Sequence, residues 1–226
     1  MKIIDIKTTI VNAEMRNWVF VKIITDQDVY GWGEATVEWK TRAVVGAIED
    51  LKPLLIGKDP RDIKQNFQIM TKHGFWKLGV IGMSAISGIE HALWDILGKS
   101  LNAPVWQLLG GKVRNKIKIY THLGMGDMKA VYRDTMEKNK LNEHAAALIE
   151  KGYKAFKVVF IPFTHHTNSI KNLEKVNQLM SSLRDEVGDD IDIMVDFHGR
   201  CASGISAIQY VKELQPYKPF FIEEPI

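Results

Sequence analysis

The sequence contains very little cysteine, no long apolar run and almost no excess of charge of either sign. One cysteine, Cys201, stands among 226 residues, and because a single thiol cannot form an internal disulfide, we expect a reducing compartment. No segment approaches the roughly 18 consecutive apolar residues of a membrane span, and the opening MKIIDIKTTIV alternates too regularly for a signal peptide. The 30 basic and 27 acidic residues leave a net charge of +3 without a dense basic run, which argues against a nucleic-acid partner. These absences predict a cytoplasmic protein with neither a membrane nor a nucleic acid as partner.

The first half of the chain reads as strands followed by helices. The composition, 46% hydrophobic and 25% charged, is globular, and the length allows one large domain or two ordinary ones. Two alternating, β-branched runs predict strands at residues 2–11 and 17–26, and Gly31 and Gly33 in DVYGWGEAT suit a turn into a further strand. Apolar residues at helical spacing then predict helices over residues 41–57, 59–74 and 84–101.

From about Lys116 the pattern changes to a regular alternation of strands and helices. Strands are predicted at residues 116–124, 153–163, 190–200 and 218–226, with helices between them at 141–152, 169–188 and 203–217. Strands that alternate with helices through short links form parallel βα units. This half therefore predicts a barrel or a doubly wound sheet.

The predicted strand at 190–200 ends in a stretch of chemically active side chains, DFHGR. In parallel α/β folds functional groups gather at the carboxyl ends of strands, and alternation along the strand puts Asp196 and His198 on one side. Glu223 and Glu224 end the next predicted strand. Asp196 and Glu223 repel one another in a partly buried site unless a cation neutralises them, and carboxylate oxygens suit Mg²⁺. The pair is either a magnesium site for an anionic substrate or two solvated or arginine-bridged acids.

Five further side chains near these strand ends have both a chemical and a structural interpretation. His198 is a natural proton-transfer group, although a lone histidine is more often structural or solvated. Arg200 can bridge the acids, hold a substrate carboxylate or form a surface salt bridge. Lys157, on the strand before, can contact a substrate carboxylate or extend from the strand edge to water. His165 and His166 follow on a loop, where they can reach a sugar-like substrate or face water, and we favour water.

Four segments together resemble the enolase superfamily: VYGWGEA, MSAISGIEHALWDILGKSLNAPVWQLLGG, VDFHGR and FIEEP. Within it the resemblance is to the mandelate racemase subgroup, and closest to galactonate dehydratases and related acid-sugar dehydratases. It implies an α+β capping domain over residues 1–112, followed by a (β/α)7β TIM-like barrel of which residues 113–226 hold the first four strands. It also implies a homo-oligomer, and a third carboxylate ligand and a histidine base on later strands beyond Ile226.

The resemblance implies a magnesium-dependent dehydration of a small sugar acid. Asp196 and Glu223 match the first two metal-ligand positions, and His198 matches the general acid that expels the 3-hydroxyl. Lys157 joins His198 among the expected catalytic residues, because its ammonium would contact the substrate. The reaction removes the proton α to a carboxylate and then eliminates water to give a 2-keto-3-deoxy acid. A metal is needed because a carbon acid beside a carboxylate is very weak.

Substrate binding is implied for the segment NAEMRNWVF of the capping domain, where Arg16 and Asn17 would contact the polyol chain, and for Arg200 in the barrel. Many relatives carry a second lysine, a base, two residues after the first. Val159 occupies that position here and cannot take a proton, which disfavours a racemase or epimerase. That activity is kept as an alternative, together with a catalytically inactive, truncated relative that has a binding role.

Overall fold

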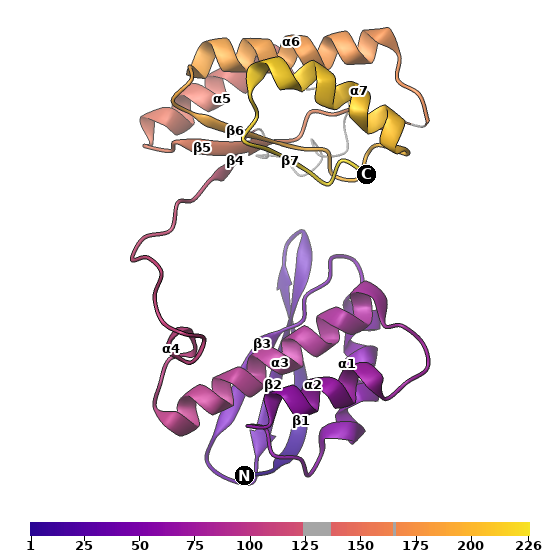
Figure 1. Ribbon diagram of the computed structural model, residues 1–226, viewed down its shortest axis with the longest axis vertical. Helices are drawn as coiled ribbons and strands as arrows, with labels where there is room; N and C mark the ends of the chain where they lie inside the picture. Colours follow the sequence, from indigo (N-terminus) through magenta and orange to yellow (C-terminus); the bar gives the residue numbers. More distant parts are fainter. Residues whose placement is uncertain (124–136, 165) are drawn as a thin grey trace. The chain divides into compact units, whose positions relative to one another are not determined.

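The computed structural model describes residues 1–123, 137–164 and 166–226, which form two compact units, Met1–Asn115 and Lys116–Ile226 (Figure 1). Each unit has its own apolar core. The first unit mixes helices with an antiparallel sheet, and the second carries a parallel sheet with helices, so the predicted fold class is confirmed. The domain boundary predicted after residue 112 falls just inside the first unit and stays a prediction.

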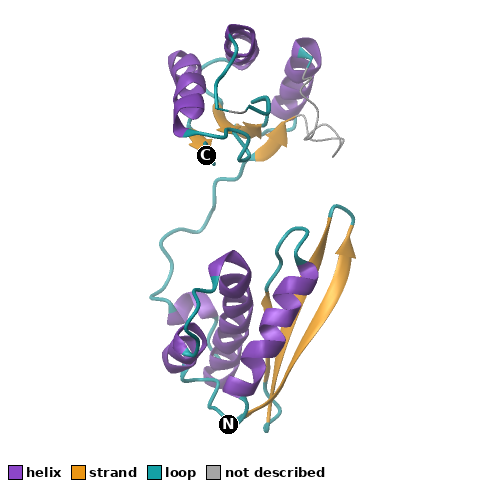
Figure 2. Ribbon diagram, turned by 90° about the vertical axis from the view of Figure 1, so that its right-hand side faces the viewer, coloured by secondary structure: helices purple, strands orange, loops and turns teal. Residues whose placement is uncertain are grey.

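The first unit is built on a three-stranded antiparallel sheet, ordered β1 (Ile3–Ala13), β2 (Arg16–Thr25) and β3 (Tyr30–Glu34). In β2 every second side chain from Val19 to Thr25 is buried, because alternate residues of a strand point to one face. Three helices cover that face (Figure 2): α1 (Thr41–Leu55), α2 (Ile63–Lys72) and α3 (Gly79–Leu101), with the short α4 (Val105–Leu108) after them.

Gly31 and Gly33 lie inside β3 and not in the turn that leads to it, so the sequence interpretation placed the strand correctly and its glycines wrongly. A Cβ atom at Gly33 would lie 1.9 Å from the carbonyl oxygen of Gly88 in α3, and one at Gly31 would lie 2.0 Å from that of Ala92. The helix backbone therefore rests directly on the strand. The glycines of VYGWGEA serve this close approach, not a turn conformation.

Among the described residues, helix α3 is the one helix long and apolar enough by length and composition to span a membrane. It does not overturn the sequence expectation, because Glu90 and Asp95 interrupt any run of about 18 apolar residues. Its buried residues, among them Ile86, Ile89, Leu93 and Ile96, belong to the core shared with the sheet. Its apolar composition is thus explained by packing at the centre of the first unit, where a helix is surrounded on several sides.

The second unit has a four-stranded parallel sheet with helices between consecutive strands, as the alternating pattern predicts. The strands, in sheet order, are β4 (Thr121–Leu123), β5 (Ala155–Val158), β6 (Asp192–Asp196) and β7 (Phe221–Glu223). The helices are α5 (Lys138–Glu150), α6 (Ile170–Val187) and α7 (Gly204–Leu214), followed by the 3₁₀ turn η2 (Gln215–Tyr217). All three α-helices lie on one face of the sheet (Figures 1 and 2).

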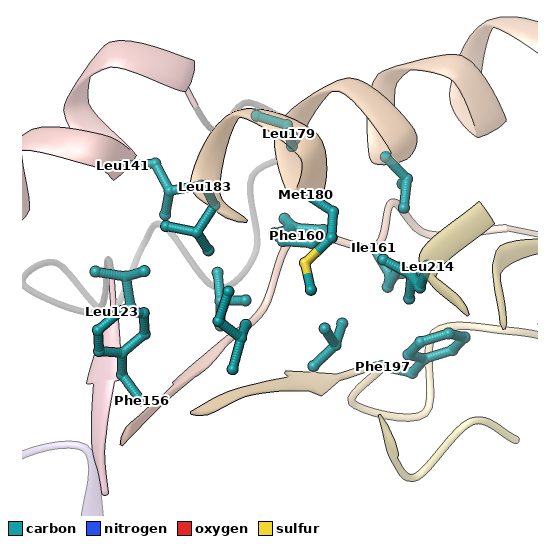
Figure 3. Packing of buried hydrophobic residues seen from close by; sticks show 14 of the residues in the cluster. Leu123, Leu141, Phe156, Phe160, Ile161, Leu179, Met180, Leu183, Phe197 and Leu214 are labelled. Atoms are coloured by element: carbon teal, nitrogen blue, oxygen red, sulfur yellow. The ribbon is translucent and has the colours of Figure 1, made fainter. Parts of the chain in front are cut away.

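The core of the second unit lies between that face and the helices (Figure 3). Phe156 and Val195 of the strands belong to the same buried apolar cluster as Leu179 and Met180 of α6. Because neighbouring residues of a strand point to opposite faces, the side chains between these core residues project from the other face of the sheet, the helix-free face, on which the described residues of this unit form no helix (Figures 1 and 2). Those side chains carry the chemistry of the unit.

Candidate active site

Two carboxylates meet at the ends of β6 and β7. Asp196 ends β6, Glu223 ends β7, and the two are register partners in the parallel ladder. Lys157 of β5 reaches both from the neighbouring strand. Its Nζ lies 3.0 Å from Oδ2 of Asp196 and 2.8 Å from Oε2 of Glu223. The structure thus brings together the two predicted metal ligands and one predicted catalytic residue on the helix-free face.

This charge cluster is largely shielded from solvent. The side chains of Lys157 and Asp196 are 8% and 7% exposed, and that of Glu223 is 32% exposed. Burial is the largest influence on the pKa of Lys157 and acts to lower it, but the hydrogen bonds and charges of Glu223 and Asp196 outweigh it, so the pKa lies above its usual range. Lys157 is therefore a cation here. The expectation that a positive charge must neutralise the two acids is met by lysine and not by the arginine considered from sequence.

A tight turn follows β6 and fixes His198 beside Asp196. The N–H of Arg200 donates to the carbonyl of Phe197 at 3.0 Å, and the two central residues, His198 and Gly199, both have positive φ, 53° and 61°. The N–H of His198 donates to Oδ1 of Asp196 at 2.7 Å. A left-handed conformation is uncommon for a residue other than glycine, so the carboxylate of Asp196 helps to hold this turn. The imidazole of His198 is exposed at the strand end.

A second acid of the FIEEP segment also joins the site. Donor atoms of Asp196, His198 and Glu224 lie within 4.8 Å of one another and form a group able to hold a metal ion. The N–H of Gly199 donates to the carbonyl of Glu224 at 3.3 Å, which ties the turn after β6 to the end of β7. Sequence reasoning noted Glu224 at the strand end but selected only Glu223 and Asp196 as ligands. Carboxylate oxygens and an imidazole at this spacing fit a divalent cation.

Arg200 lies inside the unit, so its interpretation as a surface salt bridge was wrong. The residue is 4% exposed. Its guanidinium donates to the carbonyl of Ile161 at 2.5 Å and lies 4.6 Å from the centre of the Phe163 ring. Arg200 thus joins the loop after β6 to the loop after β5. Its role in substrate binding stays a prediction.

The other predicted residues belong to the first unit, follow β5 on a loop, or lie outside the described residues. Arg16 and Asn17 belong to the first unit, at the β1–β2 hairpin. Arg16 pairs with Glu38 at 2.5 Å, and their contact with a substrate stays a prediction. His165 lies outside the described residues, and His166 is exposed.

Sequence reasoning missed His122, on β4. It is the register partner of Lys157 and therefore shares the helix-free face with the charge cluster. Burial first, and then the charge of Lys157, hold the pKa of His122 below its usual range, although Asp196 and Glu223 oppose this shift. The alternation of side chains along the strand was the available signal. His122 directly precedes the core residue Leu123, just as Lys157 directly precedes the core residue Val158.

Two family models match the chain. "Mandelate racemase / muconate lactonizing enzyme, N-terminal domain" covers residues 2–110, and "Enolase C-terminal domain-like" covers residues 140–226. Together they account for most of both units. The segments that resemble the superfamily, from VYGWGEA to FIEEP, fall within these matches except for Gly111, the last residue of the second segment.

Individual proteins agree with the family models. A D-galactonate dehydratase of Cronobacter sakazakii is 42% identical over 209 residues, which are 92% of this chain and 52% of that protein. The chain therefore spans about half the length of the curated relatives it matches. Among solved structures, an enolase from Pantoea ananatis with bound D-gluconate and Mg has a TM-score of 0.84, and an enolase superfamily member from Salmonella Typhimurium has 0.90, each at 30% identity and over 100% of this chain but 60% and 61% of theirs. The chain belongs to the enolase superfamily, in its mandelate racemase and muconate lactonizing enzyme branch, and is close to the galactonate dehydratases.

Proposed function

We propose that the complete protein is a magnesium-dependent acid-sugar dehydratase of the galactonate dehydratase type. The observation that carries the proposal is the cluster at the ends of β6 and β7, where Lys157 contacts both Asp196 and Glu223 and His198 lies alongside. The 42% identity to a D-galactonate dehydratase supports the reaction class. The D-gluconate bound to the Pantoea ananatis enolase supports a polyhydroxy acid as substrate.

Asp196 and Glu223 would hold the Mg²⁺, and the carboxylate of Glu224 is near enough to Asp196 to take part. The fit rests on the donor set, because carboxylate oxygens are the ligands that Mg²⁺ prefers. When bound, Mg²⁺ supplies the positive charge that stabilises a carboxylate substrate as its α-proton leaves.

Lys157 and His198 provide the polar groups that the substrate would meet. The ammonium of Lys157 is buried and charged, so it can bind and orient a carboxylate oxygen. The exposed imidazole of His198 would donate its proton to the leaving 3-hydroxyl, which departs as water. The hydrogen bond from the N–H of His198 to Asp196 fixes the backbone of His198, and so the point from which its imidazole extends, relative to the metal ligands. Burial of Lys157 and Asp196 keeps water away from the charges that orient the substrate.

A racemase or epimerase of the same subgroup is disfavoured by Val159. Two opposed bases are required to take a proton from either face of a carbon, and the second-strand base of such enzymes would stand two residues after Lys157. Val159 is 7% exposed and has a hydrocarbon side chain, which cannot accept a proton. One-sided proton removal followed by elimination fits this chain better.

The test is a screen of the complete protein against sugar acids, with D-galactonate and D-gluconate first, for a 2-keto-3-deoxy product with and without Mg²⁺. We expect product only with the metal. The variant His198→Ala should lose at least about 100-fold in kcat, as is typical for loss of a general acid, while its Mg²⁺ affinity stays within about twofold. The control is His73→Ala, at the end of α2 in the first unit, where the ring contacts the carbonyl of Met70.

Three outcomes would change the proposal. Dehydration at the wild-type rate by His198→Ala would show that another group is the acid. Isomerised substrate without loss of water would favour the racemase or epimerase. Binding of sugar acids without any turnover would favour an inactive relative with a binding role. A small sugar acid as the ligand and a homo-oligomeric state remain predictions that the same preparation can test, and cytoplasmic location remains a prediction for cell fractionation.

A further inference from the structure

The site contains more negative charge than a buried cluster tolerates unaided. Asp196 and Glu223 stand in register on adjacent strands, and one oxygen of each lies within 3.0 Å of the same nitrogen, Nζ of Lys157. Two carboxylates so placed repel one another and lose hydration. The ammonium compensates both effects, because it donates to Glu223 and pairs with Asp196 at once.

Lys157 therefore contacts the same carboxylates that would hold the metal. A divalent cation bound between Asp196 and Glu223 cannot share them with an ammonium without strong repulsion, because like charges at these distances repel even when the protein screens them. The amine must leave at least one carboxylate when a metal binds. Once released, its charge is available for another anion.

We propose that Lys157 is a built-in counter-cation, which holds Asp196 and Glu223 in place before the metal binds and competes with the metal for them. This inference rests on the proposed function for the identity of the metal site. It adds an order of events, since binding of the metal frees the ammonium and the freed ammonium then attracts the carboxylate of the substrate. Lys157 acts as a positioning residue for the ligands before it contacts the substrate.

The decisive variant is Lys157→Met, compared with Lys118→Met as a matched control. Lys118 forms an ion pair with Asp192 at the amino-terminal end of β6, and its side chain is 66% exposed. For the complete protein stripped of metal with EDTA, we expect Lys157→Met to lower the melting temperature by about 5 °C or more. Calorimetric titration with Mg²⁺ should show an affinity at least about tenfold higher than that of the wild type, and the rise in melting temperature on adding Mg²⁺ should be correspondingly larger. Lys118→Met should leave the Mg²⁺ affinity unchanged.

An affinity that falls in Lys157→Met would overturn the proposal, since it would mean that the lysine only keeps the carboxylates in place. The wild type offers a second measurement in case the variant does not fold. Lysines are acetylated with a water-soluble reagent and mapped by mass spectrometry, with and without Mg²⁺. Lys157 should react faster when Mg²⁺ is present and Lys118 should not change. An unchanged rate at Lys157 would refute the competition.

Neither measurement requires turnover, so the two proposals fail separately. A protein that binds Mg²⁺ more tightly without Lys157 but dehydrates no sugar acid would refute the proposed function alone. An active dehydratase whose Lys157→Met variant binds Mg²⁺ more weakly would refute the counter-cation alone.

Discussion

The contact between β3 and α3 allows a sharp test through Gly33→Ala. The added Cβ would lie 1.9 Å from the carbonyl oxygen of Gly88, and also 2.9 Å from Cβ of His91 and 3.0 Å from the amide nitrogen of Ala92. A carbon and an oxygen approach to about 3.3 Å at the closest, so strand and helix must separate by more than about 1 Å. The obstacle is backbone, which cannot rotate away as the end of a side chain could.

The cost follows from what α3 buries. Ile86, Ile89 and Leu93 are fully buried in the core that the helix shares with the sheet. A gap of about 0.5–1 Å already removes a quarter to a half of the dispersion energy of the atoms on either side. Together with the overpacking itself, we expect Gly33→Ala to lower the free energy of unfolding by about 3–5 kcal/mol. That is a large share of the roughly 5–15 kcal/mol that stabilises a typical domain.

The assay is urea denaturation followed by circular dichroism, with Gly46→Ala as the control. Gly46 lies in the interior of α1 and is exposed, and within the described part of the chain no neighbouring atom comes within 4 Å of the place that an added methyl group would take. Alanine there should raise the free energy of unfolding by about 0.5–1 kcal/mol. A loss of less than about 1 kcal/mol in Gly33→Ala, or a loss in Gly46→Ala, would refute the reasoning.

Three further predictions concern capping and pH. Ser203 accepts from the N–H of Ser206 in a capping box at the start of α7, so Ser203→Ala should cost about 1 kcal/mol in urea denaturation. The side chain of Arg61 holds the pKa of Asp59 at about 2, below its ordinary 3.8. The stabilisation from this pair is present above pH 3.8 and is lost as pH falls toward 2. Because the pair is near the surface, Arg61→Ala should make the loss of melting temperature between about pH 4 and 2 only slightly shallower. Burial and then the charge of Lys157 lower the pKa of His122 below 6.5. Metal-free protein should therefore lose stability as pH falls below 6.5, because the unfolded chain takes up a proton that the folded chain does not. His122→Gln should make this loss of melting temperature between about pH 7 and 5 less steep.

Local patterns were enough to predict the elements of this fold, because the apolar residues that become buried recur with the period of a strand or a helix. Alternating apolar residues marked β1 and β2, and the strand–helix alternation after Lys116 marked the parallel sheet. Element limits were less predictable, since the strand predicted at 190–200 is paired only over Asp192–Asp196. The glycines of β3 were misread because their reason is a helix backbone more than 50 residues away in the sequence, which no local pattern reveals.

The sequence was enough to predict that Asp196 and Glu223 lie together, but not that Lys157 bridges them. Asp196 and Glu223 end apolar runs, and the parallel register of such strands makes them neighbours. The bridge by Lys157 depends on the stagger between β5 and β7, which are not adjacent. His122 escaped notice although it lies in the predicted strand at 116–124, because only the pairing of β4 with β5 brings it beside Lys157.

The backbone conformation of the turn after β6 bears on why a histidine occupies position 198. His198 has a left-handed backbone at φ 53°, next to a glycine at φ 61°. A glycine at position 198 would adopt this conformation without the cost of about 1 kcal/mol that a side chain incurs there. The bond from the N–H of His198 to Asp196 offsets part of that cost, but a glycine N–H would make the same bond. Since the backbone geometry would be served as well or better by glycine, the turn alone does not explain histidine at this position, and a role of the imidazole in proton transfer beside the carboxylates stays a prediction.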